Sequence, residues 1–448
     1  MKTRDVLPIA CAALACLVVP ELFAQRAPLA PTPPMGWNSW DSYGTTVTEA
    51  QVKANADAMA RDLARFGWQY ITVDIQWYQP TARGHDYVVG ARLSMDDSGR
   101  LLPSPNKFPS AANGAGFKPL ADYIHAKGLK FGIHIMRGIP RQAVAANAPI
   151  PGTPYHARDI ADTTNGCRWN PDMWGVDVTK PGGQAYYDAI ATLYASWGVD
   201  FVKADDMGDH KFQPSEIAAL RLALDKTRRP IILSISPGPA PLGQAAFFAE
   251  HSQMWRISDD FWDSWRLVRK QFDYTRDWAP YVGVNGGWPD ADMLPFGRLR
   301  ITDSAGRGSP SRLNADEQRT VMTLFSIFRS PLIMGGDLPT MDAPTLALLT
   351  NPEVLAVNQG GRGPRQVLDQ SGIRVWTSLA PAAADRFVAL FNLDTLPRTV
   401  SLPWTDVALS NGRHRVRDLW GRKALGDADS LRAELPAHGS VLYRVSAP

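Results

Sequence analysis

A lysine and two aspartates end an apolar run in FVKADDM, residues 201–207. Charged side chains are rarely buried unless they are paired, so this position needs either solvent or a chemical role. Alternate residues of a strand share a face, and Phe201, Lys203 and Asp205 therefore point the same way. A lysine beside a carboxylate favours the ionised form, which suits a nucleophile. The alternative is a buried ion pair with a purely structural role.

A second acidic cluster lies in WRISDDFWDSW, residues 255–265. Asp259, Asp260 and Asp263 stand there among three tryptophans and Arg256. Aromatic walls desolvate a carboxyl group and raise its pKa, while a nearby arginine restrains that rise. One ionised and one protonatable carboxyl group are the equipment of a retaining glycosidase. The alternative is a solvated loop whose tryptophans belong to the core.

Four further polar residues end or follow other apolar runs: Asp74 in ITVD, His134 in GIHIM, Ser236 in ILSIS and Asp292 in WPDADML. Each alone is more often structural than functional. Several strand ends that deliver polar groups to one face are a stronger indication of a site. Two aspartates without further ligands are a weak metal signal. The sequence also has no HExxH, GxSxG or GxxxxGKS motif, which disfavours zinc hydrolysis, serine-esterase chemistry and P-loop phosphoryl transfer.

Alternating strands and helices must position these residues. Between about 35 and 335, apolar runs such as GWQYITVDIQW and LKFGIHIM follow helical patterns such as VTEAQVKANADAMARDLARF and FKPLADYIHAKG. This alternation predicts βα units and a parallel sheet. About eight units, with DMLPFG as the seventh strand, fit a (β/α)₈ TIM barrel, whose active site lies at the carboxyl ends of the strands. An open doubly wound sheet is the alternative.

The pattern changes near residue 365. Short strand-like runs follow, including IRVWTSL, DRFVALFNL, RTVSLPW, HRVRDLW and SVLYRV, with turn residues and no long helix between them. This pattern predicts a C-terminal antiparallel β-sandwich. We therefore expect a catalytic barrel over residues 25–362 and a sandwich domain over residues 363–448.

The first 24 residues have a different composition. Two basic residues precede the short apolar run VLPIACAALACLVV, which is typical of a secretory signal peptide over residues 1–24. A membrane anchor is the alternative. Signal removal would leave an exported protein, periplasmic or extracellular, with Cys167 as its one cysteine and no membrane contact. The net charge of +3 and the lack of a long Lys/Arg run do not indicate a nucleic-acid partner.

Several ordered motifs resemble glycoside hydrolase family 27, the α-galactosidase and α-N-acetylgalactosaminidase family. The motifs are TPPMGWNSW, ITVD followed by a tryptophan, GLKFGI, a strand ending in K-x-D, WR followed by an aspartate and DSW, and DADML. The resemblance spans residues 31–360. It implies a saccharide substrate, no metal or cofactor, and a retaining double displacement with Asp205 as nucleophile and Asp260 as acid/base. It further implies that Lys203 neighbours the nucleophile, that Trp40 lies against the sugar, and that Asp74, Arg256 and Asp292 bind its hydroxyl groups.

The sequence departs from the family pattern at several positions. Ile75 replaces the second of two adjacent aspartates, and Met207 replaces a cysteine of the usual active-site disulfide. His134 replaces a tyrosine, and Ser236 lies in SISPGP where relatives carry Cys-Glu-Trp or Cys-Ser-Trp. An isoleucine cannot pair the polar groups near C4 and C6 of galactose, whereas it suits L-arabinopyranose, which lacks C6.

We therefore expect an exported retaining exo-glycosidase that resembles the α-galactosidases and removes terminal α-galactosyl units through a glycosyl-aspartate intermediate. Within the family, the alternatives are a β-L-arabinopyranosidase and an α-N-acetylgalactosaminidase. The alternative from another class is a carbohydrate-binding protein that has lost catalysis. The sequence does not indicate the oligomeric state.

Overall fold

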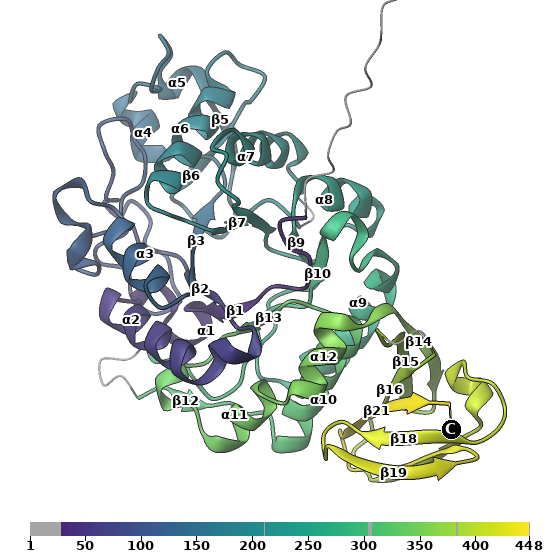
Figure 1. Cartoon of the computed structure of the whole chain (residues 1–448). Helices are drawn as coiled ribbons and strands as arrows, with labels where there is room; N and C mark the ends of the chain where they lie inside the picture. Colours follow the sequence, from purple (N-terminus) through teal and green to yellow (C-terminus); the bar gives the residue numbers. More distant parts are fainter. Residues whose placement is uncertain (1–27, 210, 303–306, 382–383, 448) are drawn as a thin grey trace, which may run out of the picture.

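A computed structural model describes residues 28–209, 211–302, 307–381 and 384–447, and the predicted signal peptide (1–24) lies outside these residues. Eight strands form one parallel sheet in the order β10-β9-β8-β7-β3-β2-β1-β13 (Figure 1). Their bounds are β1 (Met35–Asn38), β2 (Tyr70–Val73), β3 (Lys130–Met136), β7 (Phe201–Asp205), β8 (Ile232–Ile235), β9 (Met254–Arg256), β10 (Trp288–Asp290) and β13 (Leu332–Met334).

The sheet closes on itself through the residues that follow β10. Leu294 donates its backbone N–H to Ile333 O at 2.7 Å and accepts from Gly335 N at 3.0 Å, which forms a parallel bridge to Met334. The seventh strand therefore lies earlier than predicted, at Trp288–Asp290 rather than in DMLPFG. The strand ends there because Asp292 has a positive φ of 83°, outside the extended region. The (β/α)₈ barrel itself is confirmed.

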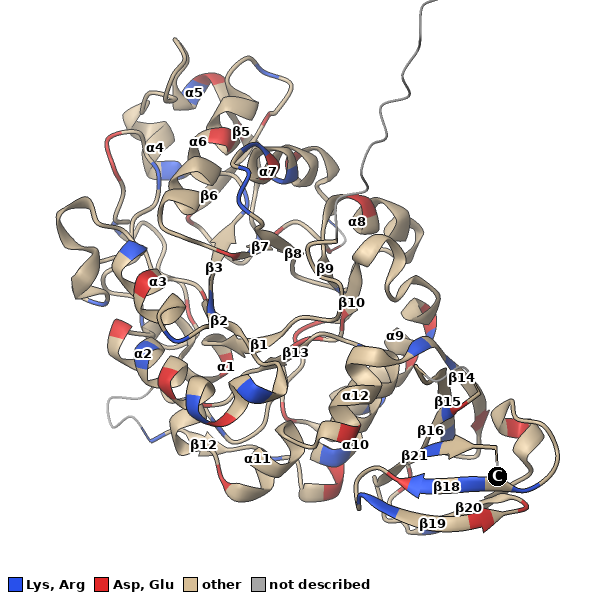
Figure 2. Cartoon of the chain, viewed as in Figure 1, with Lys and Arg blue, Asp and Glu red and all other residues tan. Residues whose placement is uncertain are grey.

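Helices follow the barrel strands along the chain, and the longer ones cover the outside of the barrel (Figure 1). The helices are α1 (Trp40–Tyr43), α2 (Glu49–Ala58), α3 (Lys118–His125), α4 (Arg141–Ala146), α5 (Ala157–Ile160), α6 (Gly183–Ser196), α7 (Pro214–Lys226), α8 (Ala245–His251), α9 (Trp265–Trp278), α10 (Ala315–Phe328), α11 (Ala343–Leu349) and α12 (Pro352–Gly360). Basic and acidic residues are interspersed along the outer helices (Figure 2). Among the described residues, no helix combines the length and apolar character that crossing a bilayer requires.

The local sequence explains where the first long helix begins and ends. Thr48 and Gln51 form a capping box, in which each side chain bonds the other residue's backbone N–H. Helical turns continue beyond α2 to Phe66, and Gly67 ends them with φ of 96°. Glycine adopts this left-handed conformation without steric cost, so the chain can turn into β2 at this point.

Side chains on β7 alternate between the inside of the barrel and the helix layer, as the sequence predicted. Phe201 packs with Tyr70 and Trp288 in a cluster of strand residues, whereas Val202 and Ala204 belong to the main core between strands and helices. Lys203 and Asp205 share the inner face with Phe201 and lie closer to the carboxyl end. The register therefore delivers both charged groups to the mouth of the barrel.

An excursion between β3 and α6 covers one side of that mouth. It holds α4, α5 and a three-stranded sheet of β4 (Ile139–Pro140), β6 (Met173–Val176) and β5 (Ala161–Gly166). The buried Arg137 fastens it to the barrel, because its guanidinium group bonds Asp206 at 2.6 Å, Glu216 at 2.7 Å and the backbone oxygen of Asn165 at 3.2 Å. β11 (Arg298–Leu299) pairs antiparallel with β12 (Ser309–Pro310), and the residue after β11 bonds to α1, from Arg300 N to Asp41 O at 2.8 Å.

The C-terminal part is an antiparallel β-sandwich, as predicted. One sheet has the order β14-β15-β16-β21-β18-β19, and β17 and β20 form the second sheet. The bounds are β14 (Arg362–Gln370), β15 (Ile373–Leu379), β16 (Arg386–Asn392), β17 (Arg398–Leu402), β18 (His414–Asp418), β19 (Lys423–Ala428), β20 (Leu431–Leu435) and β21 (Ser440–Ser446). Val375 and Leu390 of one sheet pack with Val400 and Leu431 of the other.

Candidate active site

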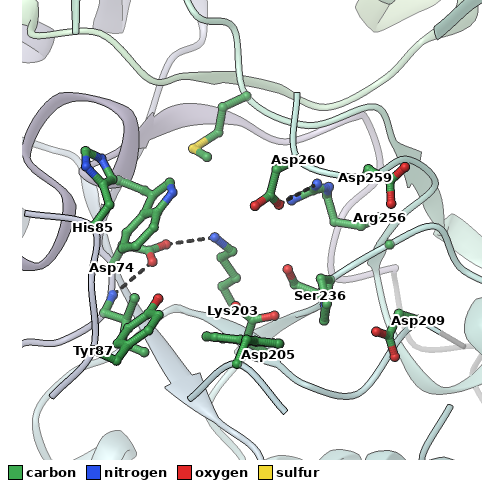
Figure 3. Close-up of a pocket in the computed structure, with 16 residues that line it drawn as sticks. Asp74, His85, Tyr87, Lys203, Asp205, Asp209, Ser236, Arg256, Asp259 and Asp260 are labelled. Carbon is green, nitrogen blue, oxygen red and sulfur yellow. Dashed lines mark hydrogen bonds and ion pairs between the residues drawn. The ribbon is translucent and has the colours of Figure 1, made fainter. Parts of the chain in front are cut away.

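A cavity of about 550 Å³ opens at the carboxyl ends of the barrel strands. Eight of the ten sequence-predicted site residues line it: Trp40, Asp74, Ile75, Lys203, Asp205, Ser236, Arg256 and Asp260. The other two, His134 and Asp292, lie behind this layer and bond to members of it. Figure 3 shows the side chains of Asp74, Lys203, Asp205 and Asp260 turned into the cavity.

Asp205 ends β7 and is almost completely buried. One carboxylate oxygen bonds His134 Nε2 at 2.9 Å, and the other accepts the backbone N–H of Asp206 at 3.1 Å. Burial alone would raise the pKa of Asp205, but the hydrogen bond and charge of His134 and the charge of Lys203 outweigh it and lower the pKa. The fold therefore presents Asp205 to the cavity as a fixed, ionised carboxylate.

Asp74 follows β2 and is held from three directions. Its Oδ2 accepts from Lys203 Nζ at 2.8 Å and from Asn38 Nδ2 at 2.7 Å, and its Oδ1 accepts from its neighbour Ile75 N at 2.9 Å. Burial opposes ionisation, but Lys203 and His134 dominate and lower the pKa of Asp74 to about 2. Burial likewise opposes the charge on Lys203, whose pKa is nevertheless raised by Asp74 and Asp205. These groups form a charged layer in which each ion has a partner.

Asp260 lies on the loop after β9, on a different wall of the cavity. Its Oδ1 contacts Arg256 at 3.2 Å, and the same guanidinium nitrogen contacts Asp292 Oδ2 at 2.8 Å. The Asp260 side chain is 66% exposed, whereas that of Asp292 is 4% exposed. Asp260 can therefore contact both water and a molecule in the cavity. Asp292, by contrast, pairs with Arg256 and accepts the backbone N–H of Phe261.

The tryptophans around Asp260 do not bury it, contrary to the sequence-based expectation. Trp255 points into the core against Phe248 and Trp278. The buried member of the acidic cluster is Asp263, which pairs with Arg300 instead. The prediction failed because the turn after β9 directs neighbouring aspartates to different environments, which spacing in the sequence does not reveal.

Two buried carboxyl groups stand behind Arg256. Burial raises the pKa of Asp292, and Arg256 only partly offsets it. Burial and the charge of Asp292 raise the pKa of Asp290 to about 7, and Asp290 Oδ1 accepts the backbone N–H of Asp292 at 2.9 Å. Asp260, Asp290 and Asp292 thus share one arginine. Within the described ranges, no group of three or more His, Cys, Asp or Glu side chains is arranged to hold a metal ion.

Ile75 lines the cavity beside Asp74 as an apolar side chain that is only 1% exposed. Several residues of the cavity wall were not predicted: His85, Tyr87, Trp169, Asp209, Pro237, Gly238 and Met293. Tyr87 stacks on Trp40 with ring centroids 6.5 Å apart and packs against Trp169 at 5.5 Å. His85, Tyr87 and Trp169 come from irregular segments, where neither helical nor strand periodicity gave a signal.

Family profiles match nearly all of the described chain. The profile described as alpha galactosidase A matches residues 32–180 and 176–360. The profile described as the alpha galactosidase C-terminal beta sandwich domain matches residues 370–445. Alpha-galactosidase 3 of Arabidopsis thaliana is 31% identical over 426 residues, which cover 93% of this chain and 82% of the relative.

Solved structures match more closely. A β-L-arabinopyranosidase of glycoside hydrolase family 27 from Geobacillus stearothermophilus is 52% identical and superposes with a TM-score of 0.91, over 93% of this chain and 97% of that one. A variant of the same enzyme in complex with arabinose gives the same identity and TM-score, over 94% and 98% of the two chains.

Proposed function

The chain belongs to glycoside hydrolase family 27, the α-galactosidase family, and we propose that it is a retaining exo-glycosidase that removes terminal β-L-arabinopyranosyl units. The family membership rests on the matching profiles and on the 31% identical plant enzyme. The choice of sugar rests on one observation, the buried Ile75 in the cavity wall. The likeness to the Geobacillus β-L-arabinopyranosidase supports the same choice.

In the first proposed step, a carboxylate oxygen of Asp205 attacks the anomeric carbon of the terminal sugar. The bond from that carbon to the leaving-group oxygen breaks, and Asp260 donates a proton to that oxygen. The lowered pKa of Asp205 keeps it ionised for the attack. The hydrogen bond from His134 holds the attacking carboxylate in place.

In the second proposed step, a water molecule attacks the anomeric carbon of the glycosyl-enzyme. Asp260 accepts the proton of that water, and the bond to Asp205 breaks, so the sugar leaves with its original anomeric configuration. The exposure of Asp260 suits this exchange with solvent. Asp74, Lys203 and Arg256 line the cavity, which supports a role for them in binding sugar hydroxyl groups.

Ile75 bears on which sugar the cavity accepts. Its apolar side chain stands beside Asp74, whose two oxygens already accept three hydrogen bonds from this chain. A hydroxymethyl group near Ile75 would find no charged partner in that side chain, and an unpaired buried hydroxyl costs about 1 to 3 kcal/mol. L-Arabinopyranose has the outline of galactose without this group, so it avoids the cost.

The test compares nitrophenyl β-L-arabinopyranoside with nitrophenyl α-galactoside in the natural protein and in Ile75→Asp. We expect the natural protein to prefer the arabinopyranoside. A carboxylate at position 75 can bond galactose hydroxyls, and charged hydrogen bonds contribute about 1.5 to 3 kcal/mol. Ile75→Asp should therefore raise the ratio of kcat/KM for galactoside over arabinopyranoside by about ten- to a hundredfold.

Ile75→Leu is the matched control, because it keeps an apolar side chain of similar volume and should leave the ratio near its natural value. An unchanged ratio in Ile75→Asp would show that this residue does not select the sugar. α-Galactosidase activity is then the second candidate, which the plant relatives support. No turnover of any nitrophenyl glycoside would favour a carbohydrate-binding protein.

We further propose that the protein is exported and consists of two domains. Residues 1–24 would be removed as a signal peptide, which places the mature enzyme in the periplasm or outside the cell. The catalytic barrel would extend over 25–362 and the sandwich domain over 363–448. The N-terminal residue of the secreted protein, read by Edman degradation, checks the first claim; a mature chain that starts at Met1 contradicts it.

A further inference from the structure

A separate hollow of about 410 Å³ lies between α9 and the β-sandwich. α9 is the barrel helix beside the sandwich in Figure 1, and Phe272 of α9 packs edge-on against Phe391 of β16 with ring centroids 5.0 Å apart. Among the described residues, none lines both this hollow and the active-site cavity. The carboxylate of Asp273 and four basic side chains line the hollow, and the basic ones are Arg266, Arg269, Lys270 and Arg374.

Three of these cations lie together at the start of α9. Residues three and four apart on a helix are neighbours, so Arg266 stands beside both Arg269 and Lys270. All three side chains are exposed, and within the described part of the chain none of them forms an ion pair. Like charges at this spacing destabilise a helix. An anion bound in the hollow would remove that repulsion.

The other two charged groups of the hollow are already paired. Arg374 on β15 contacts Asp369 Oδ1 at 2.6 Å, and Asp273 accepts from Arg276 Nη1 at 2.8 Å. The uncompensated charge of the hollow is therefore that of the three cations at the start of α9. The whole chain has a net charge of only +3, so this is a local concentration of positive charge.

The hollow also offers apolar surface. Phe272 and Leu393 are buried in its lining, and Trp265 is half-buried there. The Trp265 ring stacks on His438 of the sandwich with centroids 3.9 Å apart, and His438 Nδ1 bonds Glu317 of α10 at 2.7 Å. These contacts hold the indole in a fixed position. A ligand of this hollow would therefore combine negative charge with an apolar face.

We propose that this hollow is a docking site for an acidic polysaccharide, which it binds through uronate units. The planar guanidinium groups of Arg266 and Arg269 match a carboxylate with two parallel hydrogen bonds. The apolar face of a pyranose ring suits the surface of Trp265, which an inorganic anion would leave unused. Because α9 directly follows the loop that carries Asp260, a polymer held here would raise the local concentration of its sugar units near the barrel mouth.

Isothermal titration calorimetry on the mature protein tests the docking site without relying on hydrolysis. The probes are polygalacturonate and its fully methyl-esterified form, which keeps the sugar backbone and lacks the charge. We expect polygalacturonate to bind and the ester to bind at least tenfold more weakly, because the ester cannot pair with the arginines. The Kd for polygalacturonate should rise with salt, since exposed charges are screened.

Arg266→Gln combined with Arg269→Gln should raise the Kd for polygalacturonate about tenfold, because two carboxylate partners are lost. Lys423→Gln combined with Arg432→Gln is the matched control, since it makes the same charge change at exposed positions on β19 and β20 of the sandwich. The control should leave the Kd near its natural value. Neither pair lines the active-site cavity, so kcat/KM for nitrophenyl β-L-arabinopyranoside should stay unchanged in both variants.

The docking site is overturned if polygalacturonate does not bind, or if the double arginine variant binds it with the natural Kd. An equal loss of affinity in the control variant would overturn it as well, because binding would then follow total charge alone. Its assignment to a sugar is overturned if inorganic polyphosphate binds as tightly as polygalacturonate and loses as much affinity in the arginine variant. A protein that binds polygalacturonate but hydrolyses no glycoside contradicts the proposed function instead.

Discussion

The two walls of the active-site cavity differ in their balance of charge. On the wall formed by the ends of β2, β3 and β7, Lys203 and His134 face Asp74 and Asp205, and the pKa of both carboxyl groups is lowered despite burial. On the wall formed by β9, β10 and the loop after β9, three carboxyl groups surround Arg256. There burial raises the pKa of Asp292, and burial with the charge of Asp292 raises that of Asp290 to about 7.

This difference in charge balance suits one barrel mouth to the two chemical roles proposed above. The first wall stabilises a negative charge before any substrate arrives, as a nucleophile requires. The second wall has more carboxyl groups than cations, and its outermost member, Asp260, reaches solvent. A group that must give a proton in one step and take one in the next needs this access to water.

The largest loss of activity should come from replacing the proposed catalytic carboxyl group of each wall in turn, Asp205 on the first and Asp260 on the second. Asp205→Asn removes the proposed attacking oxygen and should lower kcat about 10⁴-fold or more on every substrate. Asp260→Asn should cost about 10² to 10⁴-fold on substrates whose leaving group needs a proton, and much less in the first step on dinitrophenyl glycosides. Azide should partly restore turnover in Asp260→Asn, since it attacks the glycosyl-enzyme without a general base.

Asp259→Asn provides the control, because it makes the same charge change one residue away from Asp260 on the same cavity wall. Asp259→Asn should lower kcat by less than about tenfold. If Asp205→Asn and Asp260→Asn behaved alike on dinitrophenyl glycosides, with no response to azide, the two walls would not have the separate roles proposed for them.

A smaller effect should appear in the pH dependence of stability. The pKa of Asp74 in the folded protein lies below its unfolded value of 3.8. Ionised Asp74 therefore contributes to the free energy of unfolding above pH 4, and this contribution is lost as the pH falls towards 2. The pKa of Asp290 in the folded protein lies above its unfolded value of 3.8. Protonated Asp290 therefore contributes to the free energy of unfolding below pH 4, and this contribution is lost as the pH rises towards 7. The two walls therefore respond to pH in opposite directions.

Denaturant unfolding between pH 4 and 8 measures this contrast. Asp290→Asn cannot ionise, so its free energy of unfolding relative to the natural protein should rise with pH, by up to about 1.4 kcal/mol per pH unit between pH 4 and 7. The same substitution at Asp273, which lies exposed on α9, controls for the change in net charge. A difference that stays constant with pH for Asp290→Asn would show that this residue is ionised throughout.

Much of the fold could be predicted because its signals are local and periodic. The strand FVKAD alternates as a barrel strand should, and the Thr48 capping box and Gly67 mark the limits of one helical segment. The seventh strand was predicted too late in the chain, because the alternation of polar and apolar residues in DADML does not reveal the positive φ of Asp292. The carboxyl ends of all barrel strands, by contrast, must lie at the same end of the barrel. Residues at those ends could therefore be assigned to one end of the barrel from the sequence.

The site could be predicted only in part, for a physical reason. Eight of the ten predicted residues line the cavity, because six of them stand at or just after a barrel strand, and Trp40 and Asp260 lie on the segments that follow β1 and β9. Tyr87 and Trp169 come from irregular segments, whose course depends on tertiary contacts such as that of Arg137 with Asn165 and that of Tyr87 with Trp169. The exposure of Asp260 likewise depends on the loop after β9 rather than on the surrounding tryptophans.

The most direct test of the account is to trap the sugar on the enzyme. Asp260→Asn is mixed with dinitrophenyl β-L-arabinopyranoside and quenched, and its peptides are then analysed by mass spectrometry. We predict one pentosyl unit covalently attached to Asp205, because the first step proceeds while the second lacks its general base. A pentosyl unit on another residue, or turnover with no covalent adduct and a product of inverted configuration, would contradict it.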